Sequence, residues 1–142
     1  MKKNIHNLVL FPFLIIFFNA CTKDNSNIEI DLAYQIIGDK TWFLESIQTT
    51  VGNNISTNNF IGQPTYYINL YKNRITKDSD GITGNYSFLK SINQLQISIV
   101  AKTVNGSNSN YSYQVVALGD KQMILLYANN ISSTKYFYST RK

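Results

Sequence analysis

The sequence predicts an all-β protein, an antiparallel up-and-down β-barrel of about eight strands with a short N-terminal helix. From residue 42 onward, short segments rich in Tyr, Ile, Val, Thr and Phe are each bounded by Gly, Asn, Asp or Ser. Several of these segments alternate apolar and polar residues, as half-buried strands do. Most connections are too short for the crossovers that parallel strands require, and closure into a barrel removes the sheet edges.

The first twenty residues have the layout of a secretory signal peptide. Lys2 and Lys3 precede an apolar run over Leu8–Phe18, which ends near the small residue Ala20. A membrane-spanning helix needs about 20 apolar residues, and this run is roughly half as long. Cys21 is the only cysteine of the chain, so it has no partner for a disulfide within the chain.

The junction of Ala20 and Cys21 resembles the lipobox of bacterial lipoproteins. The resemblance implies that Cys21 is lipidated after cleavage before it, and acyl chains hold such a protein on a membrane almost permanently. Thr22 stands where Asp retains Gram-negative lipoproteins in the inner membrane, so the resemblance implies a lipid anchor in the outer membrane. Whether the domain faces the periplasm or the cell surface stays open. The alternative is a plain signal peptide or an uncleaved anchor with an incidental cysteine.

Without the signal peptide (1–20), the chain has the length of a single domain and its formal net charge falls from +5 to +3. The basic residues are scattered, so no nucleic-acid partner is expected. Residues 21–27 are expected to be the lipidated cysteine and a polar tether, because this stretch has too little apolar area to order itself. The barrel domain is expected to span residues 28–142.

This domain begins with a helix over Ile28–Gly38, in which apolar residues recur near helical spacing and a glycine ends the element. The expected strands are Trp42–Thr50, Thr65–Lys72, Arg74–Lys77, Ile82–Phe88, Gln94–Ala101, Tyr111–Leu118, Gln122–Ala128 and Thr134–Thr140.

Period-two alternation assigns side chains to faces of the sheet. In QLQISIV, one face carries Leu95, Ile97 and Ile99. In YSYQVVAL, one face carries Tyr111, Tyr113, Val115 and Ala117.

Turns and loops follow from glycine and asparagine. Asp80-Gly81 and Gly119-Asp120 are expected to be hairpin turns in which glycine supplies the positive φ. Gly52–Pro64 is expected to be a long loop over one mouth of the barrel, and Asn105–Asn110 a second flexible loop.

Three stretches, IIGDKTWFLESI, YYINLYKNRITKDSDGITGNYSF and QLQISI, resemble the lipocalin-like domains of small bacterial (Gram-negative) lipoproteins. The resemblance covers residues 36 to the end. Its shared features are Gly38 with Trp42, the Asp80-Gly81 turn, Gly84 with Tyr86, and Leu95 with Ile97. It implies a small β-barrel, and none of its motifs is catalytic.

The residue types of the domain give little support for catalysis. The only histidine, His6, lies in the signal peptide, and the cysteine is assigned to lipid, so no zinc or other metal site, no cofactor and no catalytic residue is expected. Asp78 and Asp80 are the nearest pair of carboxylates, but their place on an Asp-Gly turn favours a solvated hairpin tip. An enzyme is therefore the third alternative, which a cleft with a perturbed carboxylate would revive.

An eight-stranded barrel can either fill with side chains or hold one small ligand. The leading hypothesis is a membrane-anchored barrel that binds a small apolar or amphipathic molecule. Its candidate ligand-binding residues are Trp42, Tyr66, Ile68, Leu70, Tyr86, Leu95, Ile97, Tyr113, Val115, Leu125 and Tyr127. The alternative is a filled barrel that serves as a non-catalytic structural or accessory subunit of a cell-envelope complex and binds protein or glycan through exposed tyrosines and the Asn-rich loops.

Overall fold

The computed structural model describes residues 26–61, 66–91, 94–102 and 106–140. Cys21 and the expected signal peptide lie outside these ranges. The elements are α1 (Ser26–Ile37), β1 (Lys40–Val51), β2 (Asn54–Asn59), β3 (Tyr67–Leu70), β4 (Ile75–Asp78), β5 (Thr83–Ser91), β6 (Gln94–Lys102), β7 (Asn108–Leu118), β8 (Gln122–Ala128) and β9 (Ser132–Ser139). In the described part of the chain, no helix has the length and hydropathy that crossing a membrane requires.

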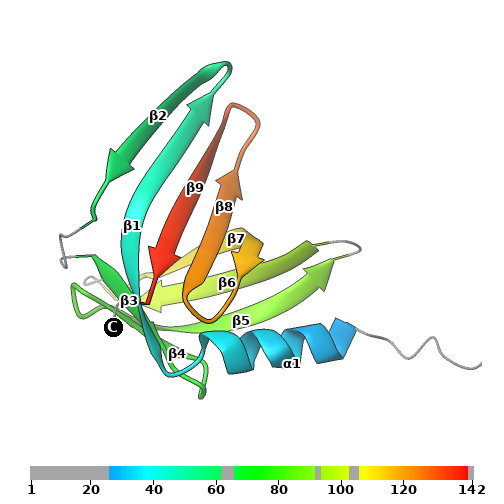
Figure 1. The fold of residues 1–142 in the computed structure, drawn as a ribbon. Helices are drawn as coiled ribbons and strands as arrows, with labels where there is room; N and C mark the ends of the chain where they lie inside the picture. The colour runs from blue at the N-terminus through cyan, green and yellow to red at the C-terminus, as the bar shows by residue number, and fades with distance from the viewer. Residues whose placement is uncertain (1–25, 62–65, 92–93, 103–105, 141–142) are drawn as a thin grey trace, which may run out of the picture.

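The strands form a closed antiparallel barrel with eight strand positions (Figure 1). Neighbouring strands follow the chain from β3 to β9, and β9 closes the barrel by pairing with β1. On its other edge β1 pairs first with β3 through Lys40–Phe43 and then with β2 through Ser46–Val51. β2 and β3 therefore share one position as an interrupted strand, which confirms the predicted fold class.

The expected loop over Gly52–Pro64 is wrong in part, because residues 54–59 form β2. Gly52, with a φ of 57°, turns the chain at the end of β1, and the six residues of β2 are all exposed. The sequence NISTNN lacks an alternating apolar face, so only pairing with β1 makes it a strand. For the same reason the loop expected over Asn105–Asn110 is partly wrong, since β7 begins at Asn108 opposite Lys102.

Two β-bulges change which side chains point inward. In β1 the register shifts between Leu44, opposite Tyr138, and Ser46, opposite Phe137, so Glu45 is the extra residue. In β7 the shift falls between Val115 and Ala117.

The β7 bulge also corrects one predicted face. Val115 lies opposite Leu125, whereas Ala117 lies opposite Ile124. Because residues directly opposite each other share a face, Ala117 is on the outer face and not on the face of Tyr113 and Val115 as alternation predicts.

The sequence predicts that Gly38 alone ends α1, but in the structure Gly38 and Asp39 share this role. Asp39, with a φ of 57°, takes the left-handed conformation, and its Oδ1 accepts a hydrogen bond of 3.1 Å from the Lys72 backbone N–H. This hydrogen bond lowers the pKa of the Asp39 carboxyl. Gly38 is required for close packing instead, since a Cβ there would lie 2.7 Å from Lys72 Cγ and 2.8 Å from the Tyr34 carbonyl oxygen.

The two predicted hairpin turns, at Gly81 and Gly119, differ in the backbone conformation of their glycines. Gly81 has a φ of 80°, as expected, and closes the turn by donating to the Asp78 carbonyl oxygen. Gly119 does not adopt a positive φ, so that part of the prediction is wrong. Its N–H donates to the Gln122 carbonyl oxygen at 2.9 Å and closes the β7–β8 hairpin.

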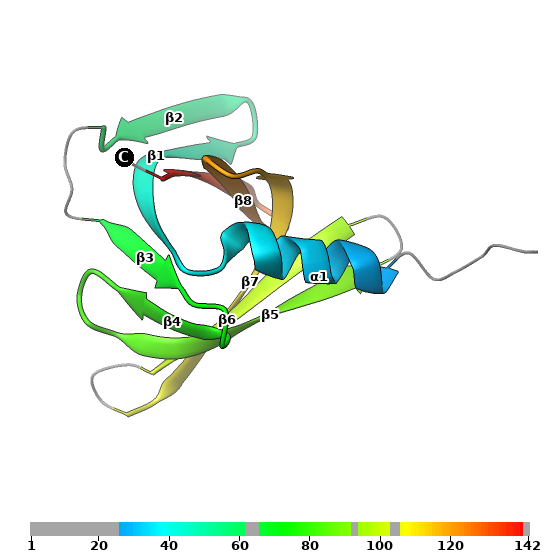
Figure 2. The same cartoon turned by 60° about the horizontal axis from the view of Figure 1, so that its bottom comes forward.

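The helix α1 lies across one end of the barrel and closes it (Figures 1 and 2). Trp42 is fully buried beneath the helix, and its Nε1 donates a 3.1 Å hydrogen bond to the Ile37 carbonyl oxygen. The Tyr34 ring packs edge-on against Phe88 at 5.0 Å, and the Tyr34 hydroxyl accepts a hydrogen bond from the Phe88 N–H. The barrel core and its helical plug therefore both lie within residues 26–140.

Candidate functional site

The barrel encloses a cavity of about 260 Å³ at the end opposite α1. The inner part of its lining is apolar and buried, and consists of Leu44, Leu70, Ile97, Met123 and Leu125. Four further apolar residues, Ile68, Ile82, Ile99 and Ala101, line its walls. The cavity thus offers an apolar surface to an apolar molecule.

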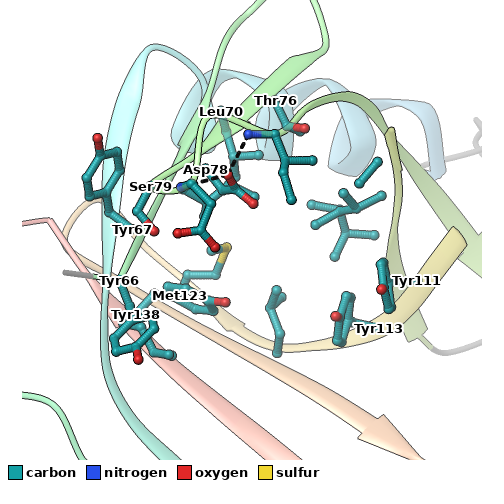
Figure 3. Close-up of a pocket in the computed structure, with 18 residues that line it drawn as sticks. Tyr66, Tyr67, Leu70, Thr76, Asp78, Ser79, Tyr111, Tyr113, Met123 and Tyr138 are labelled. Carbon is teal, nitrogen blue, oxygen red and sulfur yellow. Dashed lines mark hydrogen bonds between the residues drawn. The ribbon is translucent and has the colours of Figure 1, made fainter. Parts of the chain in front are cut away.

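Polar and aromatic side chains complete the lining of this cavity. Five tyrosines, Tyr66, Tyr67, Tyr111, Tyr113 and Tyr138, line it together with Thr76, Asp78, Ser79 and Asp80. In Figure 3, Tyr111 and Tyr113 lie on the opposite side of the cavity from Tyr66 and Tyr67, and Asp78 and Met123 lie between them.

The β4–β5 hairpin holds the carboxylate of Asp78 in place. Its Oδ1 accepts hydrogen bonds from the N–H groups of Asp80, at 3.0 Å, and Ile82, at 2.8 Å. The N–H of Ser79 donates to the Tyr67 carbonyl oxygen at 2.9 Å and ties the hairpin to β3. These bonds form an Asx turn whose side chain is fixed at the cavity (Figure 3).

Tyrosine rings contact one another along β7, β8 and β9. Tyr113 lies edge-on to Tyr136 at 5.6 Å and to Tyr127 at 6.3 Å, and stacks with Tyr111 at 6.5 Å. Burial, followed by these neighbouring tyrosines, raises the pKa of Tyr113 to about 12. Burial also raises the pKa of Tyr138 well above its ordinary value. Both hydroxyls are therefore neutral at physiological pH.

The stability of the barrel should fall steeply as the pH rises above 10. Burial raises the pKa of Tyr86, like that of Tyr113, from 10.0 to about 12, so the unfolded chain releases these protons at a lower pH than the folded barrel. The stabilising contribution is fully present below pH 10 and is lost as the pH rises through 12. Urea unfolding midpoints on either side of pH 10 measure the loss.

Tyr113→Phe is the matched variant for this pH dependence. It removes one of the tyrosines with a raised pKa and should make the alkaline loss of stability shallower. Tyrosinate absorbance should show a corresponding fraction of tyrosines that ionise only as the protein unfolds. If all tyrosines of the folded protein titrated near pH 10, this prediction would be wrong.

The described residues contain no group of three or more His, Cys, Asp or Glu side chains that could hold a metal ion. The carboxylates that line the cavity are those of Asp78 and Asp80, and no third acidic side chain is among the lining residues. The site combines apolar side chains with five tyrosines and two carboxylates.

Comparison with known proteins supports the description of this barrel. No protein-family model matches the sequence, and no curated protein matches it significantly. Among solved structures, the chain is similar to a lipocalin-like protein from Bacteroides uniformis, with a TM-score of 0.50 and 18% sequence identity. The alignment covers 74% of this chain and 98% of the Bacteroides chain. The fold is lipocalin-like.

The lipocalin-like barrel brings six of the eleven candidate ligand-binding residues to the cavity. They are Tyr66, Ile68, Leu70, Ile97, Tyr113 and Leu125. Trp42 and Tyr86 are buried in the core beside α1, and Leu95 and Val115 line a shallow depression next to Glu29 of α1. Tyr127 is 43% exposed and meets the cavity only through its ring contact with Tyr113. These five residues do not line the cavity.

Twelve lining residues are not among the sequence candidates. They are Leu44, Tyr67, Thr76, Asp78, Ser79, Asp80, Ile82, Ile99, Ala101, Tyr111, Met123 and Tyr138. Alternation places several of them on the inner face of their strands, as Ile99 follows Ile97 and Met123 precedes Leu125. No such pattern marks Asp78 and Asp80, because acidic residues on a hairpin are ordinarily solvated.

Proposed function

We propose that this protein is an outer-membrane lipoprotein, anchored through Cys21, whose lipocalin-like barrel binds a small apolar or amphipathic molecule and has no catalytic role. The anchor rests on the sequence around Cys21 alone. The binding function rests on one observation, the cavity of about 260 Å³ with buried Leu70, Ile97 and Leu125 in its lining. Since packed interiors leave few voids larger than a water molecule, a cavity of this size favours a bound ligand.

The size of the cavity limits the ligand. A cavity of about 150 Å³ lined by Leu, Ile and Phe holds a benzene molecule, so about 260 Å³ corresponds to roughly ten carbon atoms. The ligand is thus a short apolar chain or a small ring system, or one end of a longer molecule that extends past the mouth.

A first test is native mass spectrometry of residues 23–142, purified without detergent, before and after extraction with organic solvent. This fragment contains the whole barrel, its helical plug and its core. We expect an adduct that extraction removes, and binding of one molecule of 1-decanol by the extracted protein. Uncharged 1-decanol tests the apolar cavity without testing any charge.

A cavity-filling variant should abolish this binding. Ile99→Trp directs an indole into the cavity from its wall, whereas Val116→Trp adds the same ring at an exposed position of β7 that does not line the cavity. We expect no 1-decanol binding by Ile99→Trp and unchanged binding by Val116→Trp, measured by calorimetry on samples with native circular dichroism. Ala101→Phe serves as a second filling variant if Ile99→Trp does not fold.

Absence of an adduct together with no binding of 1-decanol by the wild-type fragment would overturn the binding function. It would favour the accessory-subunit alternative, for which exposed apolar side chains near the hairpin ends provide support. Ile131 is 79% exposed next to β9 and Ile55 is 65% exposed in β2. Purification of the intact lipoprotein with its envelope partners would then be the next experiment.

A further inference from the structure

The charges around the cavity all have one sign. Among the residues that line it, Asp78 and Asp80 are the acidic ones, and no Lys, Arg or His is present. The neighbouring Lys77 is exposed and does not line the cavity, because alternation along β4 turns it to the outer face. The whole chain carries a formal net charge of +5, so the negative charge of the cavity lining is opposite in sign to that of the chain.

The carboxylate of Asp78 is fixed but not neutralised. Both of its hydrogen bonds are accepted by Oδ1, from the N–H groups of Asp80 and Ile82. None of the ion pairs within the described ranges involves Asp78 or Asp80. Asp78 is partly buried, and a negative charge that is partly removed from water attracts a cation more strongly than an exposed one.

Tyrosine rings add to the preference of the cavity for a cation. Tyr66, Tyr67, Tyr111, Tyr113 and Tyr138 line this cavity together with Asp78 (Figure 3), and Asp80 belongs to the same lining. The faces of aromatic rings are negative and attract ammonium groups. An apolar interior, aromatic rings and the fixed carboxylate of Asp78 together match a molecule with an apolar body and a cationic head.

We infer that the ligand is an amphipathic organic cation, a chain or ring system of about ten carbons that carries an ammonium group, and not a fatty acid. This inference rests on the proposed binding function and specifies its ligand. The apolar part occupies the buried lining around Leu70 and Ile97, and the ammonium group lies near Asp78. A fatty acid would have to place its carboxylate near the fixed carboxylate of Asp78 and the exposed one of Asp80, with no lining cation to compensate.

The test compares three ligands with the same chain and different heads: decylamine, 1-decanol and decanoate. Binding to residues 23–142 is measured by calorimetry at neutral pH, with native mass spectrometry to confirm a single site. We expect decylamine to bind at least about tenfold more tightly than decanoate, with 1-decanol between them. Added salt should weaken the binding of decylamine more than that of 1-decanol.

The double variant Asp78→Asn with Asp80→Asn removes the charge and retains the turn. The asparagine side chain introduced at position 78 still has an oxygen that can accept from the N–H groups of residues 80 and 82. We expect this variant to lose most of the preference for decylamine and to bind 1-decanol as the wild type does. Asp31→Asn, on the exposed face of α1, makes the same kind of charge change away from the cavity and should alter nothing.

The outcomes separate this inference from the function on which it rests. If decanoate bound as tightly as decylamine, or if the double variant kept the full preference for decylamine, the inference would be overturned and the binding function would stand. If Ile99→Trp retained decylamine binding, the amine would be bound outside the cavity, which also overturns the inference. If none of the three ligands bound to the wild-type fragment, the binding function itself would fail.

Discussion

Replacing Trp42 with alanine should destabilise the barrel by about 3–5 kcal/mol, the usual cost of removing a buried tryptophan. Trp42 is fully buried where α1 meets the barrel, and its Nε1 donates to the Ile37 carbonyl oxygen at 3.1 Å. Alanine would leave a cavity beneath the helix and a backbone carbonyl without its donor. A domain of this size has about 5–15 kcal/mol of stability in total, so a large part of it would be lost.

Urea unfolding, followed by far-ultraviolet circular dichroism, measures this loss. Trp42→Phe is the matched variant, because it retains an aromatic ring but removes the donor to Ile37, and it should cost about 1–3 kcal/mol. Trp42 does not line the cavity, so the folded fraction of either variant should still bind 1-decanol. A loss below about 1 kcal/mol for Trp42→Ala would mean that the helix does not depend on this contact.

Replacing Gly84 with alanine should have an effect of similar size, through overpacking and not through a cavity. A Cβ at position 84 would lie 2.2 Å from the Val100 carbonyl oxygen and 2.9 Å from the Ala101 Cα. Both contacts are with the backbone of β6, which cannot move without separating β5 from β6. We expect a loss of about 3 kcal/mol or more, at the upper end of the usual cost of overpacking.

The control for Gly84→Ala is Gly119→Ala. Gly119 does not have a positive φ, and its added Cβ would come no closer than 3.9 Å to the atoms around it. This second substitution should be neutral or stabilising by up to about 1 kcal/mol, because alanine restricts the unfolded chain. Ala101 and Ile99 line the cavity from β6, so Gly84→Ala should also weaken the binding of 1-decanol. Equal stability of the two variants would contradict this account of Gly84.

Alternation along the strands can be recognised without any knowledge of the fold. Side chains point to opposite faces at every second residue, so Ile97 and Leu125 are assigned to the interior without reference to the rest of the chain. The short turns then require antiparallel neighbours, and eight such segments favour a closed barrel. The structure confirms this fold class.

Where the local sequence pattern predicts the wrong element or the wrong face, contacts between distant segments decide the structure. Asn54–Asn59 is a strand only because β1 extends beyond β3 and offers its free edge. The bulge at Glu45 and the one after Val115 move later side chains to the other face, and the sequence carries no mark of an extra residue.

The candidate site depended most on the tertiary structure. The sequence supplied six lining residues, because they are apolar or aromatic and alternate along strands. It placed Asp78 on a hairpin tip, but whether that tip is surrounded by water or adjoins a cavity depends on contacts with distant residues, such as the hydrogen bond from the Ser79 N–H to the Tyr67 carbonyl oxygen of β3. Likewise, only the packing of α1 on Trp42 determines which end of the barrel is closed, since burial is a property of distant residues brought together.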